Sequence, residues 1–441
     1  MSGAKAKIKK QAEALLEWFA REARDLPWRR TRDPYAIWVS EIMLQQTQVK
    51  TVIPYWERWM KAVPDLPALV RAKPDRLHKL WEGLGYYSRV RNLQKAARQI
   101  LQRHEGKFPE DFEQVLELPG IGRYTAGAIC SIAFNQPRPI LDGNVIRVLA
   151  RVHGLKGDPK EKSLNRRLWQ LAEEYVVAAP GQHGRLNESL MELGALVCLP
   201  RAPRCGVCPL RDSCVAHRGG RTAELPELPR RAPATPRWFA AFVVRKGGRF
   251  LVVRRPHHVV NGNLWEFPNV ELSHPVANSG KTKTADSGRP MNGIPKRQGT
   301  AALQDALRRS GALEGAPAFG VRQSSGAFPS SSGPGHPLSW ALTHLTSAAK
   351  AKISDSDSAS LAAIGSLSVR PEALKLLCTI KHSITRYRIT VEAFEAEAVG
   401  PSSSTTRQGR WLTLSEMQKL AFTSAHRKIL RFLLSPQASK P

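Results

Sequence analysis

The spacing of apolar residues changes about halfway along the chain. Over residues 8–103 and 164–196, apolar side chains recur every three or four positions, which is the period of an amphipathic helix. From about Phe239 onward this period is lost, and short apolar runs at 239–244 and 250–253 flank a glycine turn, as in two strands of a hairpin. The chain is also too long for one ordinary core. We therefore expect a multidomain protein, with an all-α domain at 8–217 and an α+β domain at 237–436.

Composition marks the segments between and within these domains. Residues 218–236 are rich in Pro, Arg and Ala without a hydrophobic period, which predicts a linker. Two tracts, 273–300 and 323–369, are rich in Ser, Gly, Pro, Ala and Lys and are predicted to be disordered insertions, with one helix at 301–309 between them. In the second domain, Gly247 and Gly248 predict a hairpin turn, and residues 380–394 predict one strand.

The stretch 118–142 combines two glycines with an acid. Pro119 ends a helix, a glycine turn follows, a second helix starts near Arg123, and Asp142 stands at the cap of a third. Gly120 and Gly122 supply backbone conformations that other residues resist, and they let backbone amides approach a phosphate. The alternative is a helical corner with a glycine turn and a capping Asp. The first interpretation predicts chemistry on a nucleic-acid backbone or sugar.

Two earlier segments carry further candidate residues. Glu41 stands among apolar residues in a helix predicted at 37–49; burial would raise its pKa and let it hold a proton near neutral pH, as a general acid must. The alternative is a solvated surface glutamate. Residues 81–89, WEGLGYYSR, join glycines, tyrosines and an arginine at a helix boundary. Such a loop can insert aromatic rings into a base stack, or simply cap a helix and fold its rings onto the core.

Net charge and the lengths of the apolar runs narrow the class of protein. Lys and Arg number 67 against 37 for Asp and Glu, a formal net charge of +30, which favours a polyanionic partner such as a nucleic acid. No apolar run approaches membrane-spanning length, and no secretion signal precedes the first helix. We expect an intracellular monomer that does not bind membranes, in a bacterial cytoplasm or, in a eukaryote, the nucleus.

Cysteines cluster near the end of the first domain. Of the six in the chain, four lie in one loop: Cys198, Cys205, Cys208 and Cys214. Structural zinc usually takes two closely spaced pairs, and this loop has only Cys205–Cys208. One loop with four thiolates suits a cubic iron–sulfur cluster at least as well. The loop is thus a metal or iron–sulfur site.

Several segments together resemble the MutY family of adenine DNA glycosylases, in the helix-hairpin-helix superfamily. They are SEIMLQQTQV at 40–49, WEGLGYYSRVRNL at 81–93, LPGIGRYTAGAI at 118–129, LDGNVIRV at 141–148 and the four-cysteine loop. The resemblance covers about residues 9–214. It implies an all-α fold with the hairpin at about 112–134, one 4Fe–4S cluster on the four cysteines, and excision of adenine mispaired with 8-oxoguanine or guanine in double-stranded DNA, leaving an abasic site.

The resemblance also implies roles for matching positions. Glu41 would protonate the adenine ring, Asp142 would stabilise the positively charged sugar, and Tyr124 and Asn144 would orient Asp142 and the sugar. The pocket for the flipped adenine would be shaped by Arg24, Leu26, Trp28, Arg29, Leu44 and Glu188. Flipping the adenine leaves a gap in the duplex. The side chains that would fill this gap and hold the partner base are Gln46, Thr47, Leu84 and Tyr86. Phosphates would be bound by Gly120, Gly122, Arg201, Arg204 and Arg211.

Tyr124 separates two related activities. Endonuclease III-like enzymes carry a lysine there, whose amine can form a Schiff base with the sugar, and they lack the glutamate that Glu41 represents. The resemblance thus implies a glycosylase without strong strand cleavage. The alternatives are a glycosylase/lyase for oxidised pyrimidines and a non-catalytic iron–sulfur protein that senses DNA damage.

The second domain resembles the Nudix-like C-terminal domain of the same family, with LWEFP at 264–268 as the best match. The glutamate-rich box of true Nudix hydrolases is missing, because residues 301–311 hold one carboxylate, Asp305. The resemblance therefore implies recognition rather than hydrolysis. Relatives contact the oxidised guanine through a Phe-Ser-His triplet; the matching positions here are Ile384, Thr385 and Arg386, and the arginine is suited to a phosphate or a guanine edge.

Overall fold

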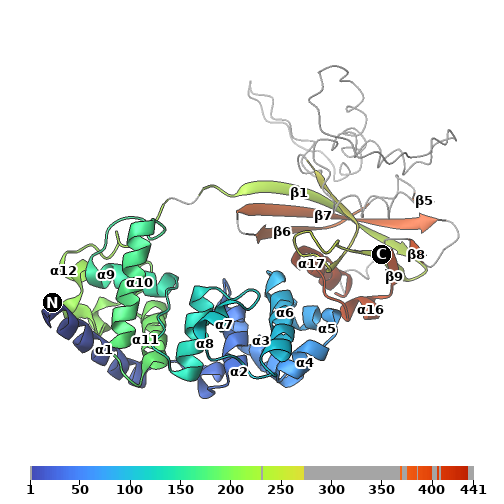
Figure 1. Cartoon of the computed structure of the whole chain (residues 1–441). Coiled ribbons are helices and arrows are strands. Elements are labelled where there is room, and N and C mark those ends of the chain that lie inside the picture. Colours follow the sequence, from blue (N-terminus) through green and yellow to red (C-terminus); the bar gives the residue numbers. More distant parts are fainter. Residues whose placement is uncertain are drawn as a thin grey trace, which may run out of the picture. The chain divides into compact units, whose positions relative to one another are not determined.

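The computed structural model describes residues 2–229, 232–272, 368–369, 375–384, 386–399, 405–406 and 409–435 (Figure 1). The chain divides into two compact units, Met1–Arg231 and Ala232–Pro441, and each is described by itself. The predicted helix at 301–309, most of both predicted insertions and Thr385 lie outside the described residues. Within the described part, no helix combines the length and apolar character needed to span a bilayer.

The first unit is helical throughout its described part (Figure 1, blue to green). Its α-helices are α1 Ser2–Glu22, α2 Pro34–Leu44, α3 Val49–Ala62, α4 Leu66–Arg71, α5 Pro74–Trp81, α6 Ser88–Arg103, α7 Phe112–Leu116, α8 Arg123–Phe134, α9 Gly143–His153, α10 Lys162–Val177, α11 His183–Leu196 and α12 Val215–Arg218. Its short 3-10 helices are η1 Pro27–Arg30, η2 Cys205–Val207 and η3 Arg211–Ser213. The all-α prediction for this unit is confirmed.

One apolar core fixes the elements that carry the candidate site. Leu15 of α1, Val148 of α9, Tyr175 of α10 and Leu190 of α11 are buried in it together. Burying each such side chain contributes about 1.5–3 kcal/mol relative to leaving it exposed. Because α9 is held on several sides, its first turn and Asp142 are placed firmly.

The glycine turn between α7 and α8 has the predicted form, with one difference. Gly120 has φ +82°, and a Cβ there would lie 2.7 Å from the side chain of Asn92, so glycine is required. Gly122 has φ −105°, which any residue can adopt. The prediction that both glycines supply unusual backbone conformations is therefore wrong for Gly122. A Cβ at Gly122 would meet nothing within 4 Å, so this side of the turn is open to an approaching group.

The single helix predicted at 37–49 is also wrong. Helix α2 ends at Leu44 and α3 begins at Val49, and Gln46 between them has φ 58°. The sequence shows no Gly or Pro at this point. The helix ends because the Arg89 guanidinium donates to the carbonyls of Ile42 and Gln45, at 2.6 and 2.7 Å, and so satisfies acceptors that a longer helix would have used.

The second unit is built on a mixed sheet with helices. Its strands are β1 Thr235–Lys246, β2 Arg249–Arg254, β3 Trp265–Glu266, β4 Asn269–Leu272, β5 Ser368–Val369, β6 Lys375–Ile384, β7 Tyr387–Val399, β8 Thr405–Thr406 and β9 Gly409–Leu412; its helices are α16 Leu414–Gln418 and α17 Ser424–Leu433. The main path runs β5-β7-β1-β2-β9-β8, with β3 beside β2, β4 beside β1 and β6 beside β7. The α+β prediction is confirmed at this level.

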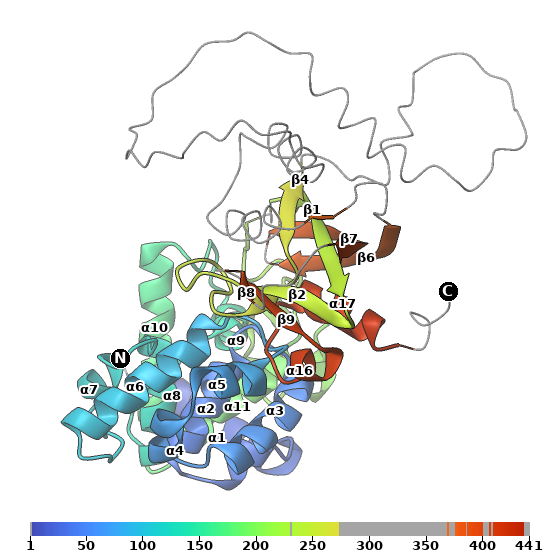
Figure 2. The ribbon, with the colours of Figure 1, turned by 90° about the vertical axis from the view of Figure 1, so that its right-hand side faces the viewer.

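Pairing within the sheet supports one prediction and corrects another. Strands β1 and β2 form the predicted hairpin, with positive φ at Gly247 and Gly248. The single strand predicted at 380–394 is instead two antiparallel strands, because the chain reverses between Ile384 and Tyr387, which pair with each other. Strands β6 and β7 lie side by side in both views (Figures 1 and 2). The half-buried positions are even-numbered over 380–384 and odd-numbered over 387–389, so the turn is marked in the sequence by a one-residue shift in the alternation.

The predicted linker at 218–236 is too long at both ends. Arg218 is the last residue of α12, and β1 already begins at Thr235. Between them Leu225 is buried in the helical core, and its carbonyl accepts a 2.8 Å hydrogen bond from Arg151. Similarly, the tract predicted to end at Val369 includes β5.

Candidate active site

Glu41 and Tyr124 meet in the interior of the helical unit. Glu41 is 5% exposed on α2, and its carboxylate accepts a 2.8 Å hydrogen bond from the Tyr124 hydroxyl of α8. Burial raises the pKa of Glu41 to about 7, and the charges of Asp142 and Glu188 act in the same direction, while the Tyr124 hydrogen bond opposes them. Glu41 is therefore not a surface glutamate. It can exist as a neutral acid near neutral pH.

Asp142 has a different set of partners. It is the N-cap of α9, as predicted: one oxygen accepts from the backbone amides of Asn144 and Val145 at 2.9 and 2.7 Å, and the other from the Asn144 side chain at 2.9 Å. Burial raises its pKa, and these hydrogen bonds counteract that rise. Donors directed at both oxygens stabilise the ionised form. The two carboxyl groups thus have environments that suit opposite protonation states.

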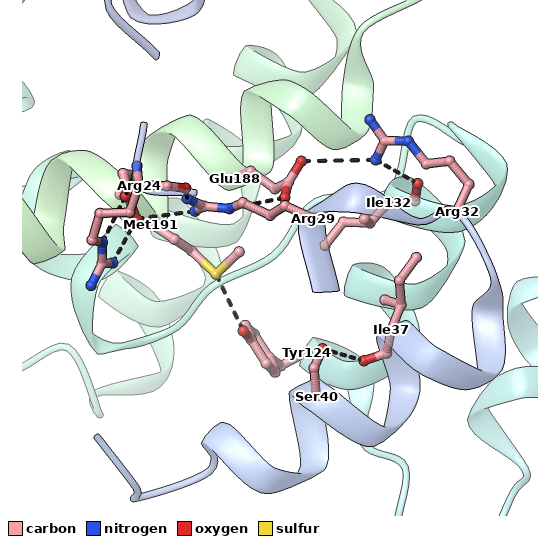
Figure 3. Close-up of polar contacts among 10 residues, drawn as sticks. Arg24, Arg29, Arg32, Ile37, Ser40, Tyr124, Ile132, Glu188 and Met191 are labelled. Atoms are coloured by element: carbon pink, nitrogen blue, oxygen red, sulfur yellow. Dashed lines mark hydrogen bonds and ion pairs between the residues drawn. The ribbon is translucent and has the colours of Figure 1, made fainter. Parts of the chain in front are cut away.

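Arginines and glutamates form a connected group next to this pair (Figure 3). Arg29 lies between two carboxylates, with Nε 3.3 Å from Glu188 and Nη2 3.0 Å from Glu192. Arg24 binds Glu192 through Nε at 2.8 Å and Nη2 at 2.6 Å. Arg32 approaches Glu188 at 3.8 Å (Figure 3). Guanidinium and carboxylate groups held in this way can recognise a polar heterocycle.

Glu192 was not singled out from the sequence. Burial acts to raise its pKa, but hydrogen bonds from Arg24 and Arg29 outweigh that effect and lower the pKa to about 2. Glu192 therefore stays ionised and holds both arginines. Its spacing from Glu188, one helical turn along α11, is the signal that could have identified it.

The other predicted pocket residues differ in exposure. Leu26 and Trp28 are buried, and Leu44 is half-buried at the end of α2. Among the residues predicted to fill the gap, Gln46 is exposed, Thr47 is half-buried and Tyr86 is 42% exposed. Leu84 is buried, so in this conformation its side chain is not available to a base, contrary to the prediction.

Three further residues near Asp142 were missed. Arg147 of α9 donates to the Asn144 side chain at 2.8 Å and to the carbonyls of Cys198 and Gly194 at 2.7 and 2.8 Å. A Cβ at Gly194 would lie 2.5 Å from the Cβ of Asn144, so only glycine lets α11 approach α9 this closely. Met191 places its sulfur 3.3 Å from the Tyr124 hydroxyl (Figure 3). Apart from the bond between Arg147 and Asn144, these contacts are long-range in sequence, and no local motif marks them.

The cysteine loop forms a second feature of the same unit. Cys198, Cys205, Cys208 and Cys214 all line one cavity, together with apolar side chains that include Val148 and Leu193. Arg151 donates to the Cys198 sulfur at 3.4 Å. In the described part of the chain, no group of three or more His, Cys, Asp or Glu residues is placed to hold a single metal ion. A shared cavity with four sulfurs, apolar walls and a guanidinium donor fits a thiolate-ligated cluster.

The remaining predicted contacts lie at the surface. Arg201, Arg204 and Arg211 are exposed on the cysteine loop, where phosphates can reach them. In the second unit, half-buried Ile384 is the last residue of β6, and exposed Arg386 lies in the turn before β7. The Arg386 guanidinium donates to the Tyr387 hydroxyl at 2.9 Å and stacks on that ring at 5.1 Å.

Comparison with known proteins agrees with this geometry. Residues 39–174 match the family model of the HhH-GPD superfamily base excision DNA repair proteins. The chain is 41% identical over 310 residues to the adenine DNA glycosylase of Rattus norvegicus, covering 58% of this chain and 60% of that protein. It is 36% identical over 260 residues to the adenine DNA glycosylase of Buchnera aphidicola subsp. Acyrthosiphon pisum (strain APS), covering 58% of this chain and 73% of that protein.

A solved structure titled as a thermostable thymine-DNA glycosylase is similar with a TM-score of 0.45 and 29% identity, over 48% of this chain and 99% of that chain. The match spans 60% of the rat protein's length, so these similarities concern only part of the mammalian relatives. The Buchnera relative is matched over most of its own length at well above chance identity. On this evidence the chain belongs to the adenine DNA glycosylase family.

Proposed function

We propose that this protein hydrolyses the N-glycosidic bond of adenine mispaired with 8-oxoguanine or guanine in double-stranded DNA and leaves an abasic site. The observation that carries the proposal is the buried Glu41–Tyr124 pair facing the charge of Asp142. Breaking the bond needs a proton for the departing adenine and a negative group for the oxocarbenium-like sugar. Glu41, with a pKa of about 7, supplies the first, and Asp142 supplies the second.

Strand cleavage through a Schiff base is not part of the proposal. That chemistry needs an amine, and Tyr124 places a phenol here. Burial also raises the pKa of Tyr124 well above its usual value, so the hydroxyl stays protonated and acts as a hydrogen-bond donor. Its role is to orient Glu41.

The four cysteines would hold a 4Fe–4S cluster. Their common cavity and the Arg151 donor support this assignment. When bound, the cluster would cross-link the loop that carries the exposed Arg201, Arg204 and Arg211. Those arginines would bind phosphates on either side of the lesion, and binding should weaken as salt increases.

We assign recognition of the partner base to the second unit, as a Nudix-like domain without hydrolase activity. Arg386 is exposed at the β6–β7 turn, and a planar guanidinium can form two parallel hydrogen bonds to a guanine edge. Preference for 8-oxoguanine over guanine would then depend on contacts near this turn.

The direct test measures adenine release by the full chain from duplexes that pair adenine with 8-oxoguanine, guanine, cytosine or thymine. We expect release opposite 8-oxoguanine and guanine, and little opposite thymine. Release from none of the four would refute the proposed function. Borohydride trapping on the same duplexes and on one with an oxidised pyrimidine should yield no covalent adduct; an adduct would favour the glycosylase/lyase alternative.

A further inference from the structure

Two separate turns in the helical unit share an unusual backbone. Gln46, between α2 and α3, has φ 58°, and Tyr86, between α5 and α6, has φ 47°. Neither is glycine, and such conformations persist only where the surroundings hold them. Both side chains are exposed, and Tyr86 is among the large hydrophobic residues exposed in the described part of the chain. The two strained, exposed turns point to a contact surface.

One buried arginine binds both turns. From the start of α6, Nη1 of Arg89 donates to the carbonyls of Ile42, Met43 and Gln45, at 2.6, 3.2 and 2.7 Å. Nη2 donates to the carbonyls of Leu84 and Gly85, at 3.0 and 3.1 Å. The first group of carbonyls leads directly into the Gln46 turn, and the second leads into Tyr86. A single planar guanidinium therefore connects the two backbones.

Aromatic contacts complete this connection. The Arg89 guanidinium lies 5.6 Å from the ring centroid of exposed Tyr86 and 5.4 Å from that of buried Trp81. It is thus fixed from the protein interior while it supports the exposed ring. Five carbonyl acceptors match the fork of an arginine, whereas a lysine has one ammonium and cannot reach both groups in the same geometry.

We propose that Arg89 is a positioning residue that holds the Gln46 and Tyr86 turns as one rigid surface, and that this rigidity promotes extrusion of adenine at the gap that the two turns are expected to fill. The proposal rests on the proposed function for its second half. Extrusion costs base stacking, which protein groups inserted into the gap must replace. Turns that are already ordered lose less entropy on insertion, so rigidity here favours the extruded state.

The first experiment tests the connection without DNA or activity. Amide hydrogen exchange is measured in the full chain and in Arg89→Lys, Arg89→Met and a control, Arg98→Met, which removes an exposed arginine from the same helix. In Arg89→Lys we expect amides in both turns to exchange together, at least about tenfold faster, while the rest of α6 is unchanged. Arg89→Lys keeps the charge and the aliphatic stem, so it serves if Arg89→Met fails to fold. Faster exchange in neither turn, or in only one, would overturn the proposal.

The second experiment tests extrusion. Each variant is combined with Glu41→Gln to prevent turnover and is bound to a duplex with 2-aminopurine in place of adenine opposite 8-oxoguanine. We expect the fluorescence gain on binding to fall at least about fivefold in Arg89→Lys and to be unchanged in Arg98→Met. An unchanged gain despite loosened turns would refute the role in extrusion. If the parent chain releases no adenine, the proposed function fails instead, and the exchange data still decide whether Arg89 connects the turns.

Discussion

Glu41 is buried, and the half-buried side chains around it come from α8, α11 and the N-cap of α9, whereas Arg386 at the β6–β7 turn is exposed and contacts its neighbour in sequence, Tyr387. Proton transfer needs the first arrangement, because only a desolvated carboxyl keeps a proton near neutral pH. Recognition of a base needs the second, because its donors must face the solvent. Substitutions should therefore act on the rate in the first region and on the choice of partner base in the second.

The largest effect is expected at Glu41. Glu41→Gln keeps the size of the side chain but removes the acid, and loss of a general acid typically lowers a rate about 10³-fold. The single-turnover rate of adenine release should fall by this factor while the affinity for the duplex is retained. A loss smaller than about tenfold would show that protonation comes from elsewhere.

The second-largest effect is expected for Gly194→Ala, a substitution at a residue with no proposed contact to the substrate. A Cβ at 2.5 Å from the Cβ of Asn144 must push α9 and α11 apart and displace Asp142. We expect adenine release to slow about 10²-fold, since small displacements of a reacting group can cost that much. Gly206→Ala in the cysteine loop is the matched control, because a Cβ there meets nothing within 4 Å. Equal rates in the two variants would contradict the close-approach argument.

The pH dependence of the rate separates the roles of Glu41 and Tyr124. The pKa of Glu41 is raised to about 7, so the protonated acid is present below pH 7 and is lost as pH rises through that value. The rate should therefore decline on the alkaline side. Tyr124→Phe removes a hydrogen bond that lowers this pKa, so the decline should move to higher pH. Single-turnover rates from pH 5 to about 9 would show this; a shift to lower pH would be inconsistent with the assignment.

The smallest effect is expected at Arg386. Arg386→Ala should lower the rate opposite guanine by a factor of about ten, the value of one or two lost hydrogen bonds, and lower the rate opposite 8-oxoguanine less, because the hydrogen on its N7 removes one acceptor. Arg388→Ala, which removes an exposed arginine of β7, is the control. If both substitutions lower the two rates equally, the turn contributes only charge.

In both regions the sequence reveals the features that follow local rules and misses those that depend on distant residues. The cap at Asp142, the helix starts near Arg123 and Gly143 and the Gly247–Gly248 hairpin follow local rules, and the structure has all of them. The break after Leu44 does not, because it is imposed by Arg89, which lies far away in sequence. The turn after Ile384 lacks glycine and proline, and a one-residue shift in the alternating pattern is a weak signal for it.

The candidate site residues also divide into those that local sequence reveals and those that distant contacts place. Glu41 and Asp142 stand in recognisable segments, and the contact of Asn144 with Asp142 was expected, whereas the hydrogen bond from Tyr124 to Glu41 was not. Glu192, Arg147 and Gly194 act by contacts between elements far apart in sequence, through charged hydrogen bonds or the absence of a side chain. Composition and spacing within one helix carry no record of such contacts. The roles of Ile384 and Arg386 remain predictions.

Asp142 caps α9, and under the proposed function it would also provide the negative charge for the sugar. Asparagine caps a helix about as well as aspartate does. A chain with Asp142→Asn should thus fold, pass cellular quality control and bind mispairs without processing them. Mixed with the unchanged protein, it should compete for the same mispairs and slow the release of adenine from them.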